Sequence, residues 1–242
     1  MLEGKVALVT GSARRLGKEI AIALAKKGAD VIVHYNESKN EAEQTRKKIE
    51  SFGGKSIAIK ADLANPTKVK DFLKTIIKKF GKIDILVNNV GNFIYKDMND
   101  YSEEEWSYLI DTTLNTTFYC CKHALPYMRK QKFGKIINIS DSLADKIQAS
   151  VKLTPYIIGK TGVLILTQTL AVTEAKFNIN VNSISPGCME NSIAKPKDDI
   201  PKGRYATYDD ITNAVLFLLD EKSDYITGAN IKVNGGWGFD LL

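Results

Sequence analysis

Short apolar segments alternate with longer amphipathic segments along the whole chain. The apolar segments are continuous and rich in β-branched residues, which is typical of strands that are buried on both faces of a sheet. Strands are predicted at residues 6–9, 30–35, 56–60, 83–87, 135–140, 179–185 and 229–233. Strands and helices that alternate in this way predict a doubly wound parallel sheet of about seven strands, with helices on both faces.

The helical segments carry recognisable start and stop signals. Asn65 is expected to cap a helix that has a proline in its first turn, and Ser102 with Glu105 forms a predicted capping box. The helix after this box is expected to run to about residue 131, with a bend near Pro126. The other predicted helices cover about residues 16–28, 38–52, 155–176 and 209–219, and residues 188–206 are expected to form a flap.

A length of 242 residues fits one large domain, and the sequence shows no repeat, linker or low-complexity tract, so residues 1–242 are interpreted as a single domain. Hydrophobic residues make up 44% of the chain and charged residues 26%, which is ordinary for a soluble protein. No apolar run reaches the roughly 18 residues that a membrane span needs, and the chain lacks the apolar core of a signal peptide. We therefore expect no membrane association.

The numbers and positions of charged residues, cysteines and histidines limit the cellular compartments and binding partners that we expect. The net charge is +6, but the lysines are interspersed with glutamates on predicted helices, so a solvated helix face explains them better than a nucleic-acid groove. Three cysteines without metal-ligand spacing favour a reduced, cytoplasmic setting. Only two histidines are present, which argues against a histidine-rich metal site. The expected partner is therefore a small-molecule substrate, with no nucleic acid.

The first strand, its turn and the following helix form a candidate phosphate-binding unit. The predicted strand at residues 6–9 leads into the turn Thr10-Gly11-Ser12, and a helical period follows at once. A glycine turn allows the backbone to approach a pyrophosphate, and the helix N-terminus offers unpaired N–H groups and a partial positive charge. Arg15 stands where such a loop often carries a second glycine.

Ligands of doubly wound sheets bind beyond the carboxyl ends of the strands. The segments expected there are residues 11–17, 35–38, 62–63, 88–91, 140–142 and 186–187. Tyr156 and Lys160 lie one helical turn apart near the start of a predicted helix, so their side chains point the same way. This pair is a candidate for chemistry at the same edge of the sheet.

A set of short motifs occurs in a fixed order along the chain: Thr10-Gly11, Asp62-Leu63, Asn88-Asn89-x-Gly91, Tyr156-x-x-x-Lys160, Asn182-x-x-x-Pro186-Gly187 and the ending Gly228…Gly235-Gly236. In this order the motifs resemble the short-chain dehydrogenases/reductases. The resemblance covers essentially the whole chain and implies a Rossmann-type sheet, a nicotinamide cofactor, and hydride transfer to or from a carbonyl or imine. It also implies that Tyr156 and Lys160 are catalytic, with the ammonium of Lys160 expected to lower the pKa of the tyrosine.

The same resemblance predicts NADPH (NADP+) as the cofactor. NAD-binding members usually end the second strand with an acid, and Tyr35 occupies that place here. Arg14 matches the family arginine that reaches the 2′-phosphate, whereas the negative charge of Glu37 argues against a phosphate at this place. Arg15 is expected to brace the cofactor phosphates or to reach an anionic part of the substrate. The predicted cofactor-binding residues are Gly11, Ser12, Arg14, Arg15, Leu16, Tyr35, Asn36, Asp62, Leu63, Asn89, Val90, Gly91, Tyr156, Lys160, Pro186 and Gly187.

The chain departs from the family pattern at two catalytic positions. The usual serine aligns with Asp141, or its place is taken by the neighbouring Ser142, and we favour Asp141. The usual asparagine aligns with Thr113, because Asn115 would point about 200° away on a helix. The predicted catalytic residues are Tyr156, Lys160, Asp141 and Thr113.

The aspartate changes the expected chemistry. A carboxylate beside Tyr156 favours a protonated phenol, opposes the oxyanion of a reduced ketone, and suits a substrate that presents N–H donors. With this aspartate, the loop Arg14-Arg15-Leu16-Gly17 and the segment His34-Tyr35-Asn36-x-Ser38, the chain looks like the pteridine reductases and dihydromonapterin reductases. The first hypothesis is therefore reduction of a pterin-type substrate. The alternatives are reduction of another carbonyl, such as a 3-oxoacyl thioester, and a non-catalytic NADPH sensor. The resemblance also implies a homotetramer that associates through the long helices at 102–131 and 155–176.

Overall fold

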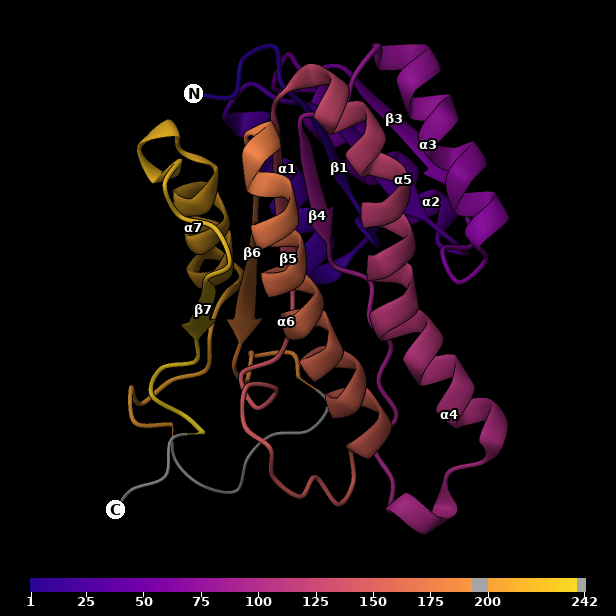
Figure 1. Cartoon of the computed structure of the whole chain (residues 1–242), viewed down its shortest axis with the longest axis vertical. Helices are drawn as coiled ribbons and strands as arrows, with labels where there is room; N and C mark the ends of the chain where they lie inside the picture. The colour runs from indigo at the N-terminus through magenta and orange to yellow at the C-terminus, as the bar shows by residue number, and fades with distance from the viewer. Residues whose placement is uncertain (193–199, 239–242) are drawn as a thin grey trace.

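A parallel sheet forms the centre of the molecule, as the sequence predicts (Figure 1). The computed structural model describes residues 1–192 and 200–238, and within these ranges seven strands pair in the order β3-β2-β1-β4-β5-β6-β7. The strands are β1 (Val6–Val9), β2 (Asp30–Tyr35), β3 (Ser56–Lys60), β4 (Ile85–Asn88), β5 (Gly134–Ile139), β6 (Ile179–Pro186) and β7 (Asn230–Val233). This order places the first βα unit beside β4, where the direction of winding reverses.

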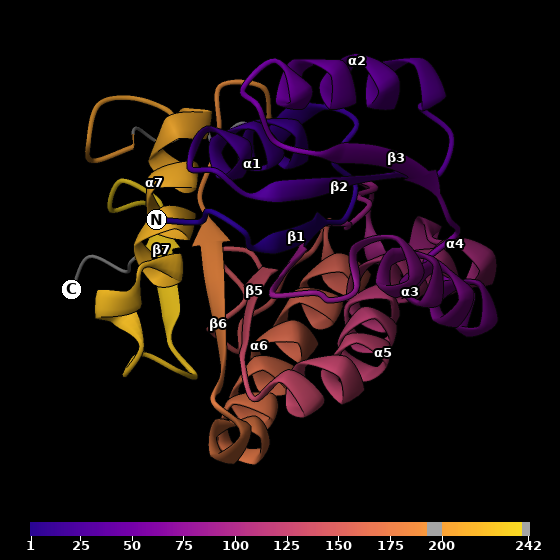
Figure 2. The ribbon, with the colours of Figure 1, turned by 90° about the horizontal axis from the view of Figure 1, so that it is seen from above.

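Helices cover both faces of the sheet (Figure 2). Alternate residues of each central strand serve the two layers: Ala7 and Val9 pack with α1, α2 and α7, whereas Val6 and Leu8 pack with α3, α5 and α6. The central strands are buried on both faces for this reason, and this explains why they are rich in apolar residues. The helices are α1 (Arg15–Lys26), α2 (Lys39–Glu50), α3 (Pro66–Phe80), α4 (Glu103–Ile110), α5 (Thr116–Gln131), α6 (Thr154–Glu174) and α7 (Tyr208–Leu219).

The predicted helix at 102–131 is interrupted. The capping box of Ser102 and Glu105 is confirmed, but residues Asp111–Asn115 form a π-helical turn between α4 and α5, whereas α5 continues through Pro126. Four threonines at this point donate their hydroxyls to the carbonyl four residues earlier, which competes with regular helical bonding. The interruption therefore follows from the threonine cluster rather than from the proline.

Helix boundaries elsewhere follow their expected signals. The Asn65 side chain accepts hydrogen bonds from the N–H groups of Thr67 and Lys68, as predicted for the N-cap of α3. A second capping box, Thr207 with Asp210, starts α7 and was not predicted. Of the predicted flap, residues 193–199 lie outside the described residues. The flanking residues are anchored, because Met189 forms a β-bridge with Ala206.

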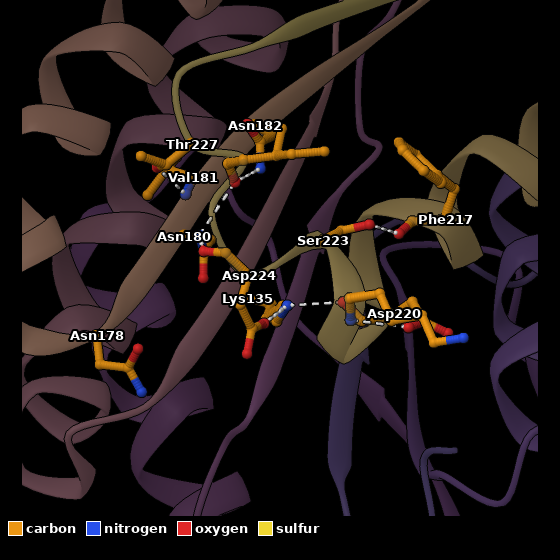
Figure 3. Close-up of polar contacts among 12 residues, drawn as sticks. Lys135, Asn178, Asn180, Val181, Asn182, Phe217, Asp220, Ser223, Asp224 and Thr227 are labelled. Carbon is orange, nitrogen blue, oxygen red and sulfur yellow. Dashed lines mark hydrogen bonds and ion pairs between the residues drawn. The ribbon is translucent and has the colours of Figure 1, made fainter.

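The amino ends of the strands are fastened by a polar cluster (Figure 3). The amide of Asn182 donates to the carbonyl of Ile226 and accepts from the N–H of Ala229, so this motif residue holds the connection into β7. The buried Lys135 reaches the carboxylate of Asp224. These contacts lie at the opposite end of the sheet from the predicted ligand site and have a structural role.

Helix α6 is the longest helix in the described part of the chain, and it is strongly apolar. Together with the turn that follows, at Thr154–Phe177, it is long and apolar enough to cross a membrane by length and composition alone. One face of α6 packs on β6, however, and Lys160 and Glu174 on this helix are buried inside the protein. Its other face carries exposed Ile158, Ile165 and Val172, which are spaced seven residues apart.

Candidate active site

The turn after β1 forms the floor of a cleft at the carboxyl ends of the strands. Gly11 has a φ of +62°, and a Cβ on Gly17 would lie 2.4 Å from the carbonyl oxygen of Gly11, so the first turn of α1 approaches the loop very closely. Helix α1 begins at Arg15 without a side-chain cap. Its first N–H groups are therefore available to an anion.

Arg15 adopts a backbone conformation that favours glycine. Its φ is +53°, in the left-handed region, which costs an ordinary residue about 1 kcal/mol. Such loops often carry glycine at this position, and the structure gives the physical reason. Arg15 keeps the loop geometry of a glycine while adding an exposed guanidinium at the mouth of the site.

Most of the predicted cofactor-binding residues line one cleft of about 740 Å³. The cleft runs from the glycine turn across the ends of β2, β3 and β4, and Glu37 and the unpredicted His34 also line it. Neither Arg14 nor Arg15 makes an ion pair with any residue in the described part of the chain. The predicted residues that line the cleft are Gly11, Arg14, Arg15, Leu16, Tyr35, Asn36, Asp62, Leu63, Asn89, Val90 and Gly91.

Ser12 does not belong to this set. Its side chain is fully buried, and its hydroxyl donates to the carbonyl of Val9 and accepts from the N–H of His34. The turn directs this side chain beneath the loop, between β1 and β2. The prediction that Ser12 binds the cofactor is therefore wrong for its side chain, which instead supports the loop.

Asn89 holds the end of β4 against the glycine turn. Its side-chain amide donates to the carbonyl of Thr10 at 3.0 Å, and its backbone N–H donates to the hydroxyl of Thr10 at 2.9 Å. The preceding Asn88 donates to the amide oxygen of Asn138 on β5, which in turn donates to Thr167 on α6. The Asn88-Asn89 motif thus aligns the cofactor-side cleft with the helix that carries Tyr156.

A second cleft of about 560 Å³ continues from the first. The two share Arg15, Leu16, Asn89, Gly91 and Asn92 in their walls. The second cleft brings together the remaining predicted site residues with an apolar, partly aromatic wall. The predicted residues are Asp141, Tyr156, Lys160, Pro186 and Gly187, and the wall includes Phe93, Tyr95, Leu143, Leu153, Met189, Tyr208 and Trp237.

Tyr156, Lys160 and Asp141 converge in this second cleft. The Tyr156 hydroxyl donates to a carboxylate oxygen of Asp141 at 3.3 Å. The Lys160 ammonium is buried, donates to the carbonyl of Ile139 at 2.7 Å, and lies 5.7 Å from the centroid of the Tyr156 ring. The N–H of Leu143 donates to the other Asp141 oxygen at 2.9 Å and orients the carboxyl group.

Burial dominates the electrostatics of these three groups. It raises the pKa of Asp141, although the Leu143 N–H and the charge of Lys160 oppose the rise. Burial and then the charge of Asp141 raise the pKa of Tyr156 well above its ordinary value, so the expected lowering by Lys160 is wrong for this structure. Burial also lowers the pKa of Lys160 to about 8. The phenol therefore retains its proton.

The structure places the neighbouring Ser142 away from the cleft. Ser142 is buried, its hydroxyl lacks a hydrogen-bond partner in the described structure, and Asp141 instead faces the cleft. Thr113 differs from its prediction: it is fully buried, lines neither cleft, and donates its hydroxyl to the carbonyl of Leu109. It packs where a Cβ on Gly159 would collide with it. Its predicted catalytic role therefore fails, because the hydroxyl serves the π-helical turn.

Sequence reasoning missed His34 and the apolar wall of the second cleft. His34 could have been recognised from the sequence, because it is a histidine in a strand that is otherwise apolar and predicted to be buried. The wall comes from loops far apart in the sequence, such as those that contain Phe93, Leu153 and Trp237, and no local pattern marks them. The ring of Phe93 meets that of Tyr156 edge-on, with centroids 5.6 Å apart.

Comparison with known proteins agrees with this geometry. A family model described as enoyl-(acyl carrier protein) reductase matches residues 11–238. A 3-oxoacyl-(acyl-carrier-protein) reductase from Staphylococcus epidermidis is 39% identical over 96% of this chain and 98% of its own. Two solved structures are also similar. A protein described as a short-chain alcohol dehydrogenase, from Sinorhizobium meliloti 1021, has a TM-score of 0.91 and 31% identity over 98% of this chain and 97% of its own.

The second solved structure is a short-chain type dehydrogenase/reductase from Mycobacterium marinum, with a TM-score of 0.90 and 32% identity over 98% of this chain and 96% of its own. Both the family model and the relatives span nearly the whole chain, including the turn after β1 and the Tyr156–Lys160 pair. The chain therefore belongs to the short-chain dehydrogenase/reductase family of oxidoreductases.

Proposed function

We propose that the protein is an NADPH-dependent reductase that adds hydride to a polarised double bond, with Tyr156 as the proton donor. The observation that carries this proposal is the convergence of Tyr156, Lys160 and Asp141 in a cleft continuous with the glycine turn. A protonated phenol, a buried ammonium and a carboxyl group at one point favour proton delivery. The family membership supports the same reaction class.

The residues of the cofactor-side cleft fit a phosphorylated dinucleotide. The close approach of Gly17 to Gly11 packs the start of α1 against the glycine turn, and this uncapped start offers N–H donors to a pyrophosphate. Arg14 is proposed to bind the 2′-phosphate, because a guanidinium suits a phosphate and β2 ends in Tyr35 rather than an acid. Glu37 is exposed and is proposed to face solvent. When bound, the cofactor supplies the hydride.

Each residue of the converging group has a distinct proposed role. Tyr156 transfers its phenolic proton to the substrate as hydride arrives. The Lys160 ammonium, fixed by the carbonyl of Ile139, stabilises the phenolate that remains and holds the cofactor ribose. Asp141 accepts the hydrogen bond of Tyr156 and thereby keeps the phenol protonated and oriented toward the cleft.

A 3-oxoacyl thioester is the proposed substrate class. The named relatives support it better than the pterin-type substrate, because the Staphylococcus epidermidis relative is a 3-oxoacyl-(acyl-carrier-protein) reductase over nearly its full length. Asp141 is compatible with this chemistry when it is protonated, since a carboxylic acid donates a hydrogen bond to a carbonyl oxygen as a serine hydroxyl does. The burial that raises the pKa of Asp141 favours that form.

A pterin-type substrate is the second candidate, on the strength of Asp141 itself. An ionised carboxylate accepts hydrogen bonds from amino and ring N–H groups, which pterins present. The edge-on pair of Phe93 and Tyr156 adds an aromatic wall suited to a planar ring. The state of Asp141 in the complex decides between the two substrate classes.

One panel of assays tests the proposal. Purified protein is offered acetoacetyl-coenzyme A or a dihydropterin, with NADPH or NADH, and cofactor oxidation is followed by absorbance. The proposal expects turnover of the thioester with a preference for NADPH, and turnover of the dihydropterin alone would support the second candidate. Binding of NADPH without oxidation on any substrate would support the non-catalytic sensor instead.

We further propose that the protein is a cytoplasmic homotetramer. The exposed stripe of Ile158, Ile165 and Val172 on α6, with Phe118 on α5, supports this assembly, since an apolar stripe of this size is suited to a partner helix. Replacement of Ile165 and Val172 by lysine is expected to lower the mass measured by light scattering below that of a tetramer. An unchanged mass would contradict association through α6.

A further inference from the structure

His34 is the one polar residue in the interior of β2. The strand reads Asp-Val-Ile-Val-His-Tyr, and His34 is 2% exposed although it also contributes to the wall of the cofactor-side cleft. It packs against Phe72 of α3, with ring centroids 5.4 Å apart. A buried polar side chain in such a strand is retained only where its hydrogen bonds are satisfied.

Both ring nitrogens of His34 are engaged by backbone groups. Nδ1 accepts the N–H of Gly11 at 2.9 Å, and Nε2 lies 2.9 Å from the carbonyl oxygen of Ala61. The N–H of Gly11 can only donate and the carbonyl of Ala61 can only accept. The imidazole is therefore neutral, with its proton on Nε2.

These two contacts join segments that are far apart in the sequence and face each other across one site. Gly11 belongs to the turn after β1, and Ala61 begins the connection from β3 to α3 that contains Asp62 and Leu63. Both segments line the cofactor-side cleft. The imidazole thus spans the base of the cleft between the glycine turn and the β3–α3 connection.

The contact with Gly11 has a consequence for phosphate binding. Because the N–H of Gly11 is already donated to His34, it is not available to a phosphate, and the turn is fixed at Gly11. The backbone of His34 adds to this restraint, since its carbonyl accepts the N–H of Ser12 at 3.0 Å. The start of α1 is left as the phosphate-facing part of the loop.

We propose that His34 is a positioning residue for the dinucleotide: its imidazole holds the glycine turn in place through the N–H of Gly11, and the carbonyl of Ala61 holds the imidazole in the tautomer that accepts this bond. This inference rests on the proposed function, because it assumes that NADPH occupies the cleft. His34 acts through the backbone of Gly11 and Ala61 and does not contact the reacting atoms.

Three replacements of His34 separate its two contacts. In His34→Asn the amide oxygen lies as far along the side chain as Nδ1 and can accept from Gly11, but it cannot reach Ala61. In His34→Gln the longer amide can donate to Ala61 but does not place an acceptor at Nδ1. His34→Ala removes both contacts.

Ser56→Ala provides a matched structural control. The Ser56 hydroxyl is buried and joins β3 to β2 by donating to the carbonyl of Val31 at 2.7 Å, at the end of the strands away from the cleft. Its loss is expected to lower stability without changing the affinity for NADPH. A residue that serves packing alone would behave in the same way.

The experiment measures NADPH dissociation constants by fluorescence titration without substrate, with kcat at saturating NADPH as a second readout. We expect His34→Ala and His34→Gln, which both lose the restraint on the N–H of Gly11, to bind NADPH about tenfold more weakly, with kcat at saturating NADPH nearly unchanged. His34→Asn is expected to restore affinity to within about threefold of the wild type. If the alanine variant fails to fold, the difference between the asparagine and glutamine variants decides the matter.

Two contrary results are distinguishable. If the wild type binds NADPH and the His34 variants bind it equally well, His34 serves stability only and the inference is overturned. If the wild type does not bind NADPH, the proposed function fails and the inference fails with it.

Discussion

The buried, neutral His34 predicts a specific loss of stability in mild acid. Its folded-state pKa is lowered to about 4 from the ordinary 6.5, chiefly by burial, while the Ala61 carbonyl and the charge of Asp62 oppose the shift. The unfolded chain therefore takes up a proton below about pH 6.5 that the native protein does not accept until about pH 4. The contribution of His34 to the free energy of unfolding therefore falls as the pH is lowered through this window, and it is constant above it.

The size of the effect follows from the two pKa values. A difference of about 2.5 pKa units corresponds to about 3 kcal/mol when the window has been fully crossed. About 2 kcal/mol of this is lost between about pH 7 and about pH 5, because the unfolded histidine is then mostly charged. The perturbation that isolates it is His34→Asn, which removes the titrating group and retains an acceptor for the N–H of Gly11.

Urea unfolding at both pH values provides the measurement. The loss of unfolding free energy between about pH 7 and about pH 5 is expected to be about 2 kcal/mol smaller in His34→Asn than in the wild type. His123 and the carboxyl groups titrate in both proteins, so their contributions cancel in this comparison. Equal losses in the two proteins would refute the reasoning and show that His34 titrates in the folded state as it does in water.

Four further predictions concern the two clefts. Tyr156→Phe is expected to reduce kcat at least about 100-fold while the NADPH dissociation constant changes less than about twofold, and retained turnover would exclude Tyr156 as the proton donor. Asp141→Ser is expected to raise kcat/KM for acetoacetyl-coenzyme A and to abolish any dihydropterin turnover, because a serine hydroxyl donates without carrying charge; a fall on the thioester would contradict the assigned role of Asp141. Arg14→Ala should weaken NADPH binding about tenfold and leave NADH binding unchanged in calorimetry, whereas equal effects on both would exclude a contact with the 2′-phosphate. Arg15→Gly is expected to remove the strain of the left-handed φ and to add backbone freedom to the unfolded chain, so the free energy of unfolding should change by less than about 1 kcal/mol. The same replacement is expected to weaken NADPH or substrate binding, and unchanged affinities would make Arg15 an ordinary surface residue.

The sequence predicted correctly those site residues whose side-chain direction follows from helix periodicity or from their place directly after a strand. Tyr156 and Lys160 share a face of α6 because they are one helical turn apart, and both reach the second cleft. Asp141 follows β5 directly, so its place at the carboxyl edge of the sheet was set by topology. Ser12 and Thr113 lie in the right segments but point the wrong way, since side-chain direction in a turn or a π-helical turn depends on local hydrogen bonds that no residue spacing reveals.

By itself, the sequence determined the layers of this protein and the edge at which its ligands bind. Strands that are buried on both faces are rich in apolar residues, and helix caps such as Asn65 and Ser102 mark helix boundaries locally, so both features can be recognised in the sequence. Only the tertiary structure decided which polar groups satisfy one another across the sheet. His34 meets Gly11 and Ala61 because three parallel strands bring their ends together, and the aromatic wall around Tyr156 comes from loops far apart in the chain. A hydrogen bond of this kind forms only when donor and acceptor are placed to within a few tenths of an ångström in three dimensions, and no local sequence pattern encodes that placement.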